Sequence, residues 1–350
     1  MITGPIFWTR LRVSLRSFRA RFRFIVSIAI LASVGGCAAR EFDQPIIEVI
    51  ETDLRQPLSK RESIRIATIN MWGVVALGFD WAEHIDERFA ALRDRMRINA
   101  DHIDVLLIQE AWKDSARRDL LTDPKVRAQF PYLVDAVEKP GGSGLAILSR
   151  HPINEARFLR FEDQGNCWRF WEGDCLGGKG VLATRIEFGD QLTWVSTTHL
   201  IACYTPELEP ETACDQSDGN SGTRAAQVKE LRSFLETLSE PALLPVLVGG
   251  DFNFTRTSRY YVAMSTSSHP QGAVWTEAHG NQIEPNRIDF IWARAGERTH
   301  WRAVIPTHPF LTEGVELPSG EIVPLSDHPA LVAEFCPVRT PDEDPLGDCR

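Results

Sequence analysis

The sequence predicts an α/β domain in which strands and helices alternate along the chain. Short apolar runs of strand length recur between longer segments whose apolar residues return at helical spacing. No stretch with the composition of a linker interrupts this alternation between residues 64 and 337. Hydrophobic residues make up 43% and charged residues 25% of the chain, which excludes disorder of the whole chain. We therefore expect one α/β domain.

Each element follows from one of two patterns. Alternating apolar and polar residues predict a strand over 64–70, and apolar residues at helical spacing predict a helix over 85–100. Further strands are expected at 105–108, 145–148, 181–186, 192–197, 246–248, 288–293 and 330–335, and further helices at 111–121 and 225–238.

The amino terminus has the layout of a secretory signal. Residues 10–23 are basic, residues 24–34 form an apolar run, and Gly35 and Gly36 follow. An apolar run of this length is too short to cross ~30 Å of hydrocarbon as a helix. The alternative is a short anchor helix that is never cleaved. Residues 34–37 are similar to a bacterial lipobox, which would make Cys37 the lipidated first residue of the mature protein.

These features divide the chain into a signal peptide (1–36), a tether (37–63), the α/β domain (64–337) and a carboxyl-terminal tail (338–350). We expect the protein to be exported to a bacterial cell envelope as a lipid-anchored lipoprotein, at the periplasmic or outer surface, or otherwise to be secreted.

Export changes the interpretation of the cysteines. Besides Cys37 there are six, and an even number in an oxidising compartment indicates disulfides. Their spacing favours the pairs 203–214 and 336–349. The zinc alternative lacks any CxxC pair or nearby cluster of Cys and His. The candidate disulfide residues are Cys167, Cys175, Cys203, Cys214, Cys336 and Cys349.

The charge of the chain disfavours nucleic acid as a partner. The formal net charge is −10, and the first 36 residues hold six Arg and no acidic residue, so the α/β domain is more acidic still. Such a surface repels a phosphate backbone. We expect no nucleic-acid partner.

Polar side chains of a few kinds recur where the predicted strands end. The set contains carboxylates, amides and two histidines but no cysteine nucleophile, and ligand sites of α/β sheets form at strand ends. Oxygen ligands of this kind suit Mg²⁺ or Mn²⁺. A serine hydrolase is the rival class, but no GxSxG elbow occurs. The residues are Asn70, Glu110, His199, Asp251, Asn253, Asp289, Asp327 and His328.

Taken in order, these motifs resemble those of the endonuclease/exonuclease/phosphatase superfamily over residues 64–335. They are Asn70-Met-Trp-Gly73, Gln109-Glu110, Thr198-His199, Gly250-Asp-Phe-Asn253, Ile288-Asp-Phe290 and Ser326-Asp-His328. The resemblance implies a DNase I-like fold, a four-layer α/β/β/α sandwich of two mixed β-sheets flanked by helices.

Other motifs resemble the neutral sphingomyelinase branch of that superfamily. They are Glu110-Ala-Trp112, the stretch 142–153, Gly173-Asp174, Gly178-Lys-Gly-Val181, and Arg224 with Gln227. The sequence departs from the branch after His199 and in a long acidic insert at 205–223. Both departures lie beside the site, and they bear on the substrate more than on the chemistry.

The resemblance also implies a role for each site residue. Glu110 would be the principal metal ligand, with Asn70 and Asp327 beside it. His328 would be the general base, oriented by Asp289 or Asp327, of which the family pattern favours Asp289. Asp251 would position the nucleophile, and Asn253 and His199 would bind phosphate oxygens. Lys179 would be a further cation near the phosphate, or else a solvated loop lysine.

The implied reaction is hydrolysis of sphingomyelin to ceramide and phosphocholine by an Mg²⁺-dependent monomer at a membrane surface. Trp168, Phe170 and Trp171 would contact that membrane or lie in the core. Two alternatives remain. One is another superfamily hydrolase, an exported nuclease or an inositol-phosphate phosphatase. The other is a catalytically silent surface lipoprotein that binds a lipid or a protein.

Overall fold

The computed structural model describes residues 47–49, 63–76, 78–136, 142–168, 177–188, 191–204, 215, 219–239, 243–266, 275–279, 287–297, 299–306 and 308–338. All of them belong to one unit, Gln44–Arg350. The predicted signal peptide and Cys37 lie outside the described residues, as does almost all of the predicted tail, so these assignments stay predictions. None of the helices in the described ranges has the length and apolar character needed to span a bilayer.

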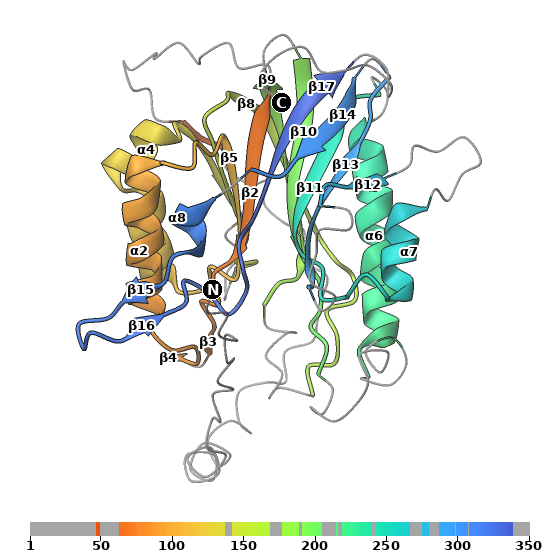
Figure 1. Ribbon diagram of the computed structural model, residues 1–350. Coiled ribbons are helices and arrows are strands. Elements are labelled where there is room, and N and C mark those ends of the chain that lie inside the picture. Colours follow the sequence, from red (N-terminus) through yellow and green to blue (C-terminus); the bar gives the residue numbers. More distant parts are fainter. Residues whose placement is uncertain are drawn as a thin grey trace, which may run out of the picture. The chain divides into compact units, whose positions relative to one another are not determined.

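Two mixed β-sheets form the centre of the unit (Figure 1). The first sheet has the order β1 (Ile47–Val49), β6 (Tyr132–Asp135), β7 (Ala146–Ser149), β5 (Val105–Gln109), β2 (Ile64–Asn70), β17 (Leu331–Val338) and β14 (His300–Val304). The second has the order β12 (Trp275–Glu277), β13 (Asp289–Arg294), β11 (Val246–Asp251), β10 (Gln191–His199), β9 (Gly180–Phe188) and β8 (Ile153–Arg160). Each sheet has one parallel pair, β2 with β5 and β10 with β11.

Helices cover the outer face of each sheet, which gives four layers (Figure 1). The first sheet carries α2 (Ile85–Ile98), α3 (Asp114–Leu121), α4 (Pro124–Gln129), α8 (Pro309–Thr312) and two short hairpins, β3 (Val75–Ala76) with β4 (Phe79–Asp80) and β15 (Val315–Glu316) with β16 (Ile322–Val323). The second sheet carries α6 (Ser221–Ser239) and α7 (Arg259–Ser265). The predicted sandwich of two mixed sheets is confirmed.

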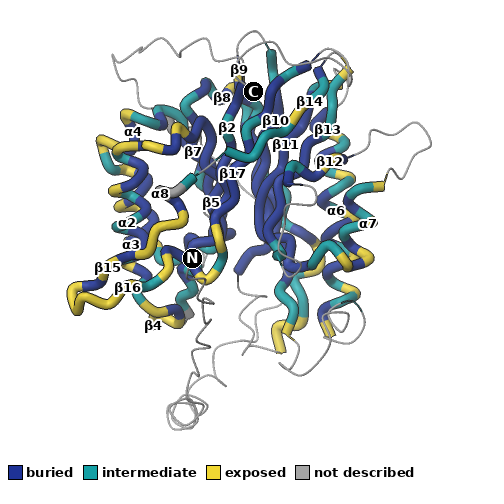
Figure 2. The backbone as a smooth tube through the Cα atoms, viewed as in Figure 1, coloured by how far each residue is buried: buried dark blue, intermediate teal, exposed yellow. Residues whose placement is uncertain are grey.

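Three apolar clusters fill the three interfaces between these layers. One packs α2 and α3 on the first sheet, one lies between the sheets, and one packs α6 on the second sheet. The central strands are therefore buried on both faces, and Figure 2 shows them as the darkest part of the chain. This explains why β5 and β11 read as continuous apolar runs in the sequence.

The two-residue period of a strand decides which side chains face the other sheet. In β2, Ile64 and Ile66 belong to the cluster between the sheets, whereas Ala67 and Ile69 belong to the cluster under the helices. The same alternation holds in the other central strands. It sends the side chain at the end of each site strand into the space between the sheets.

The predicted strands are the central ones, and the missed strands lie at the edges or are short. β8 and β14 are edge strands with few buried positions, so their sequences carry little apolar signal. The predicted helix at 111–121 begins later, at Asp114, because residues 111–113 connect the end of β5 to α3.

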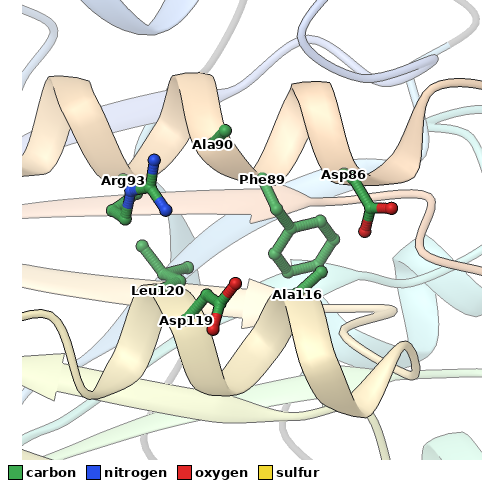
Figure 3. A pocket seen from close by; sticks show the side chains of 7 residues that line it. All are labelled: Asp86, Phe89, Ala90, Arg93, Ala116, Asp119 and Leu120. Carbon is green, nitrogen blue, oxygen red and sulfur yellow. The ribbon is translucent and has the colours of Figure 1, made fainter.

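A surface hollow of about 200 Å³ lies between α2 and α3 (Figure 3). Its lining contains none of the residues that the sequence assigns to a site. The lining residues are Asp86, Phe89, Ala90, Arg93, Ala116, Asp119 and Leu120.

We predict that Gly249→Ala destabilises the fold by about 1–3 kcal/mol, the usual cost of overpacking a core. A Cβ on Gly249 in β11 would stand 2.8 Å from Leu107 Cδ1 and 3.3 Å from Thr68 Cβ across the sheet interface. The matched control is Gly222→Ala in α6, where nothing lies within 4 Å, and there the helix should gain slightly in stability. Urea unfolding measures both. Equal stability of the two variants would contradict close contact between the sheets at Gly249.

Candidate active site

Strand register in the second sheet places three site residues in one row. His199, the last residue of β10, pairs with Asp251 of β11, and Asp251 pairs with Asp289 of β13. On the other side His199 pairs with Gly180, which Lys179 precedes. Because side chains at paired positions point to the same face, His199, Asp251 and Asp289 meet at one edge of the sheet, and Lys179 directly precedes this row.

The first sheet supplies the opposite wall. Asn70 and Gln109 end the parallel strands β2 and β5 and are paired in register. The Asn70 amide donates a hydrogen bond across the gap to Asp251 Oδ2 at 3.1 Å. Gln109 Nε2 donates to Thr197 Oγ1 of the second sheet at 2.7 Å. Two polar contacts thus join the sheets directly at the site.

A group of possible metal ligands lies in the gap between these walls. One ligand atom from each of Glu110, His199 and Asp251 lies within 4.8 Å of the others. The second carboxylate oxygen of Glu110, Oε2, is buried and has no hydrogen-bond partner in the described part of the chain. A buried carboxylate oxygen is costly without a partner, and a divalent cation is a suitable one. The donor set therefore fits a cation such as Mg²⁺ or Mn²⁺.

Lys179 is buried against this group, with 1% of its surface exposed, so it is not a solvated loop lysine. Its Nζ lies 2.7 Å from His199 Nε2 and 5.6 Å from the centre of the Trp112 ring. An ammonium group can only donate, so a nitrogen of His199 accepts this bond. His199 is then neutral, and burial and the Lys179 charge both lower its pKa well below the usual value.

His328 and Asp289 form the second half of the site. His328 Nδ1 lies 2.8 Å from Asp289 Oδ2 and 4.0 Å from Asp251 Oδ2. Asp289 is therefore the carboxylate that contacts the ring. The side chain of Asp327, the other candidate, interacts with its neighbour Ser326. Ser326 also donates to the Asn70 carbonyl and accepts from the His328 N–H, so it fixes His328 against the end of β2.

The carboxylates and His328 perturb one another strongly. Burial raises the pKa of Glu110, and it raises the pKa of Asp251 to about 7, although His328 opposes the latter shift. Burial lowers the pKa of His328, but the charge and hydrogen bond of Asp289, with smaller effects from Asp251 and Asp327, raise it to about 11. In the metal-free protein at neutral pH, His328 is therefore an imidazolium.

Two further predicted site residues lie nearby with other contacts. Asn253 has a left-handed backbone (φ 51°), and its amide nitrogen donates to the Leu200 carbonyl at 2.9 Å. Asp327 lies outside both groups of candidate ligand atoms found among the described residues. The predicted phosphate contacts of Asn253 and His199 and the predicted metal contact of Asp327 stay predictions.

Arg224 and Gln227 act on the backbone that follows His199. From α6, Arg224 donates to the carbonyls of Ile201 and Ala202 at 3.2 and 2.8 Å. Gln227 accepts from the Ile201 N–H at 2.8 Å and donates to the Asp163 carbonyl at 2.7 Å. These two motif residues therefore fix loops beside the site and do not reach into it.

Sequence reasoning missed Arg88, a buried arginine of α2 that holds the backbone after Asn70. A signal was present, because Arg88 stands among Ile85, Phe89 and Leu92 on the apolar stripe of its helix. A charged residue on such a stripe is expected to have a specific partner.

Three of the six cysteines predicted to form disulfides lie among the described residues. Cys167, Cys203 and Cys336 are each disulfide-bonded. Cys175, Cys214 and Cys349 lie outside the described residues, so the pairs 203–214 and 336–349 stay predictions. Trp168 has 87% of its surface exposed, and the alternative that it lies in the core is wrong. Phe170 and Trp171 lie outside the described residues.

This geometry belongs to a known family. The model of the Endonuclease/Exonuclease/phosphatase family matches residues 67–328, and the chain is a member of that family. It is 28% identical to sphingomyelin phosphodiesterase 2 of Rattus norvegicus over 54% of this chain and 41% of that one. It is 24% identical to an inositol phosphosphingolipids phospholipase C of Schizosaccharomyces pombe, over 66% and 51%. The chain thus spans about half the length of these relatives.

Solved structures share the fold. Sphingomyelinase C from Streptomyces griseocarneus aligns with a TM-score of 0.53 at 18% identity, over 78% of this chain and 99% of that one. A Staphylococcus aureus beta toxin variant with bound magnesium ions aligns with a TM-score of 0.52, also at 18% identity, over 78% and 99%. At such identities the likeness concerns the fold alone.

We predict that Mg²⁺ stabilises the protein more at pH 8 than at pH 5. Burial raises the pKa of Asp251 to about 7 and also raises that of Glu110, so the folded protein binds protons here as the pH falls, and a protonated carboxyl is a poor ligand. At ~100 times its dissociation constant, Mg²⁺ adds about 2.7 kcal/mol. Thermal unfolding at both pH values measures the difference. An equal shift at both, or a full shift in Glu110→Gln at pH 8, would show that the cation binds elsewhere.

Proposed function

We propose that this protein is a metal-dependent phosphodiesterase that cleaves a phospholipid in phospholipase C fashion, with sphingomyelin as its substrate. The observation that carries the proposal is the joint placement of two groups at one edge of the paired sheets. One is Glu110 with His199 and Asp251, and the other is His328 with Asp289. Family membership and the similarity to sphingomyelin phosphodiesterase 2 support the same reaction.

Glu110 and Asp251 would hold the cation, and His199, which accepts from Lys179, would lie beside them to bind a phosphate oxygen. When bound, Mg²⁺ supplies a Lewis acid that polarises a phosphoryl oxygen and offsets negative charge in the transition state. Asn70 keeps Asp251 in place through its amide hydrogen bond. Lys179 adds a buried positive charge beside His199, where it attracts the phosphate group of a substrate.

His328 would take the proton from the attacking water. Asp289 accepts from Nδ1, which leaves Nε2 as the nitrogen that can act as base. The base form requires loss of the proton that the surrounding carboxylates hold on the ring. Positive charge at Glu110 and Asp251 favours that loss, because it weakens the attraction between the carboxylates and the imidazolium.

The exposed Trp168 supports a lipid surface as the place of reaction. It follows the disulfide-bonded Cys167 in the segment that leads from β8 towards Lys179. An exposed indole beside a disulfide is a rigid apolar contact for a membrane interface. Export and lipid anchoring through Cys37 belong to the same proposal, and so does a monomeric state.

The test is turnover by the purified full chain on sphingomyelin, phosphatidylcholine, an inositol phosphate and plasmid DNA, each with Mg²⁺ and with EDTA. We expect release of phosphocholine from sphingomyelin only with Mg²⁺, and a loss of at least ~10² in Glu110→Gln, since a polarising metal supplies several kcal/mol. The control is Glu187→Gln, an exposed site at the other end of β9, which should keep full activity.

Each of the other possible results would indicate a different function for this protein. DNA cleavage or phosphate release would indicate one of the other superfamily hydrolases, and no turnover of any substrate would indicate a silent binding protein. Full activity on sphingomyelin in EDTA would overturn the proposed metal site but would support the proposed substrate.

The role of His328 predicts a specific pH dependence. His328→Ala should lower turnover by at least ~10², the lower end for general base catalysis. Asp289→Asn should cost less and move the acidic limb of the pH profile to lower pH, because a carboxylate that raises the His328 pKa is lost. His199→Ala should lower the rate without moving the limb.

Turnover against pH with saturating Mg²⁺ measures these effects, with Asp327→Asn as the control for the carboxylate that does not contact the ring. A larger shift in Asp327→Asn than in Asp289→Asn would reverse the assignment of the orienting residue. Wild-type turnover in His328→Ala would remove His328 from the mechanism.

A further inference from the structure

Arg88 is a buried cation that joins the turn after β2 to the segment just before its own helix. It has 2% of its surface exposed and lies on the apolar stripe of α2. Its guanidinium donates to the carbonyls of Met71 at 3.1 Å, Trp72 at 3.0 Å and Glu83 at 2.6 Å. Two separate nitrogens of the rigid guanidinium fork bind these carbonyls, and the single ammonium nitrogen of a lysine does not reproduce that spacing.

The turn that Arg88 holds is strained. Trp72 has a left-handed backbone with φ 47°, a conformation that a bulky residue avoids. Such a conformation persists only where the surroundings fix it. Arg88 fixes it from two sides, since it binds the Trp72 carbonyl and its guanidinium carbon lies 4.6 Å from the centre of the Trp72 ring.

The same turn orients two residues of the proposed metal site. The Trp72 N–H donates to Asn70 Oδ1 at 2.8 Å, which turns the amide nitrogen of Asn70 towards Asp251. The Gly73 N–H donates to the Glu110 carbonyl at 3.0 Å. Glu110 also has a left-handed backbone (φ 54°), so this bond helps to fix the direction of its side chain. One turn therefore holds the ends of both β2 and β5.

The turn at residues 71–73 is tightly packed against its neighbours. A Cβ on Gly73 would stand 2.5 Å from the Glu110 carbonyl oxygen and 3.1 Å from the Phe89 ring. Any shift of residues 71–73 would therefore move the Glu110 backbone. Arg88 also places a positive charge near the carboxylates, since Asp327 and Glu110 are the two acidic groups that act on it most strongly.

We propose that Arg88 is a positioning residue of the metal site, which clamps the turn at residues 71–73 so that Asn70 holds Asp251 in place and Glu110 presents its carboxylate to the same cation. The inference rests on the metal site of the proposed function. It assigns a task to a residue that touches neither the cation nor the substrate. Loss of a residue that supports metal ligands in this way usually lowers metal affinity by about 10–100-fold.

The experiment measures Mn²⁺ binding to the purified full chain by electron paramagnetic resonance, which needs no substrate. The variants are Arg88→Lys, which keeps the charge but not the fork, Arg88→Gln, which loses both, and Gly73→Ala, which displaces the same turn. The matched control is Arg95→Lys. Arg95 is a second buried arginine of α2, and it donates to the carbonyls of Glu313 and Gly314 at 2.9 and 2.8 Å, which belong to the segment leading into β15.

We expect the dissociation constant for Mn²⁺ to rise about 10-fold or more in Arg88→Lys, Arg88→Gln and Gly73→Ala. It should stay at the wild-type value in Arg95→Lys. Turnover of sphingomyelin by Arg88→Lys should recover in part at high Mn²⁺, with KM for the lipid unchanged. Thermal unfolding of each variant separates a loss of affinity from a loss of fold, and Gly73→Ala tests the turn independently if the Arg88 variants do not fold.

Three results would overturn the inference. Wild-type Mn²⁺ affinity in folded Arg88→Lys would show that the charge alone matters, and wild-type affinity in Gly73→Ala would show that the turn does not position the ligands. An equal loss in Arg95→Lys would reduce the effect to general destabilisation. If the wild-type protein binds no Mn²⁺, the metal site itself fails and the role of Arg88 fails with it. If Mn²⁺ binds but sphingomyelin is not cleaved, only the proposed substrate is lost.

Discussion

The close approach of the two sheets at Gly249 determines how the site is built. Gly249 of β11 faces the side chains of Leu107 and Thr68, which leave no room for a side chain at position 249. Directly beyond this contact, Gln109 reaches Thr197 across the gap, and Asn70 reaches Asp251. Short polar side chains can bridge two sheets only where the backbones are this near. The site therefore depends on packing two residues deeper in the strands.

The parallel strand pairs bring the site residues together at the edge beside this contact. In each sheet the parallel neighbours end at the same edge, and the register brings Asn70 beside Gln109 and His199 beside Asp251. An antiparallel neighbour can contribute only where its strand begins, as β13 does with Asp289. Ligands therefore come from strand ends in one case and from strand starts in the other. This explains why the site residues are spread over more than 250 positions of the sequence.

Much of the fold could be predicted because the central strands are buried on both faces. Continuous apolar runs and alternating patterns identified β2, β5, β10, β11 and β13, and a polar residue at each end identified the site edge. Edge strands such as β8 and β14 were missed because few of their positions are fully buried, so their sequences carry little apolar signal. Strand parity, once the packed clusters show which face is which, puts Asn70, His199 and Asp251 on the face towards the other sheet.

The side-chain contacts within the site could not be predicted in the same way. Whether Lys179 is solvated or buried depends on where the start of β9 meets Trp112 and His199, which no local pattern encodes. The same holds for Arg88, whose partners are backbone carbonyls of residues 71, 72 and 83 and leave no trace in side-chain chemistry. Motifs indicated which residues gather at the site, and only tertiary packing assigns each of them its partner.

Charge balance connects the two halves of the site. Glu110, Asp251 and Asp289 are packed into one buried gap, and such carboxylates need positive charge nearby. In the metal-free protein, Lys179 and the protonated His328 supply that charge. The same attraction to the carboxylates is what raises the pKa of His328. A divalent cation at Glu110 and Asp251 would take over the task and weaken the hold on the His328 proton. Binding of the cation and release of the base would then be two results of the same electrostatic change, so a site without metal would also lack an active base.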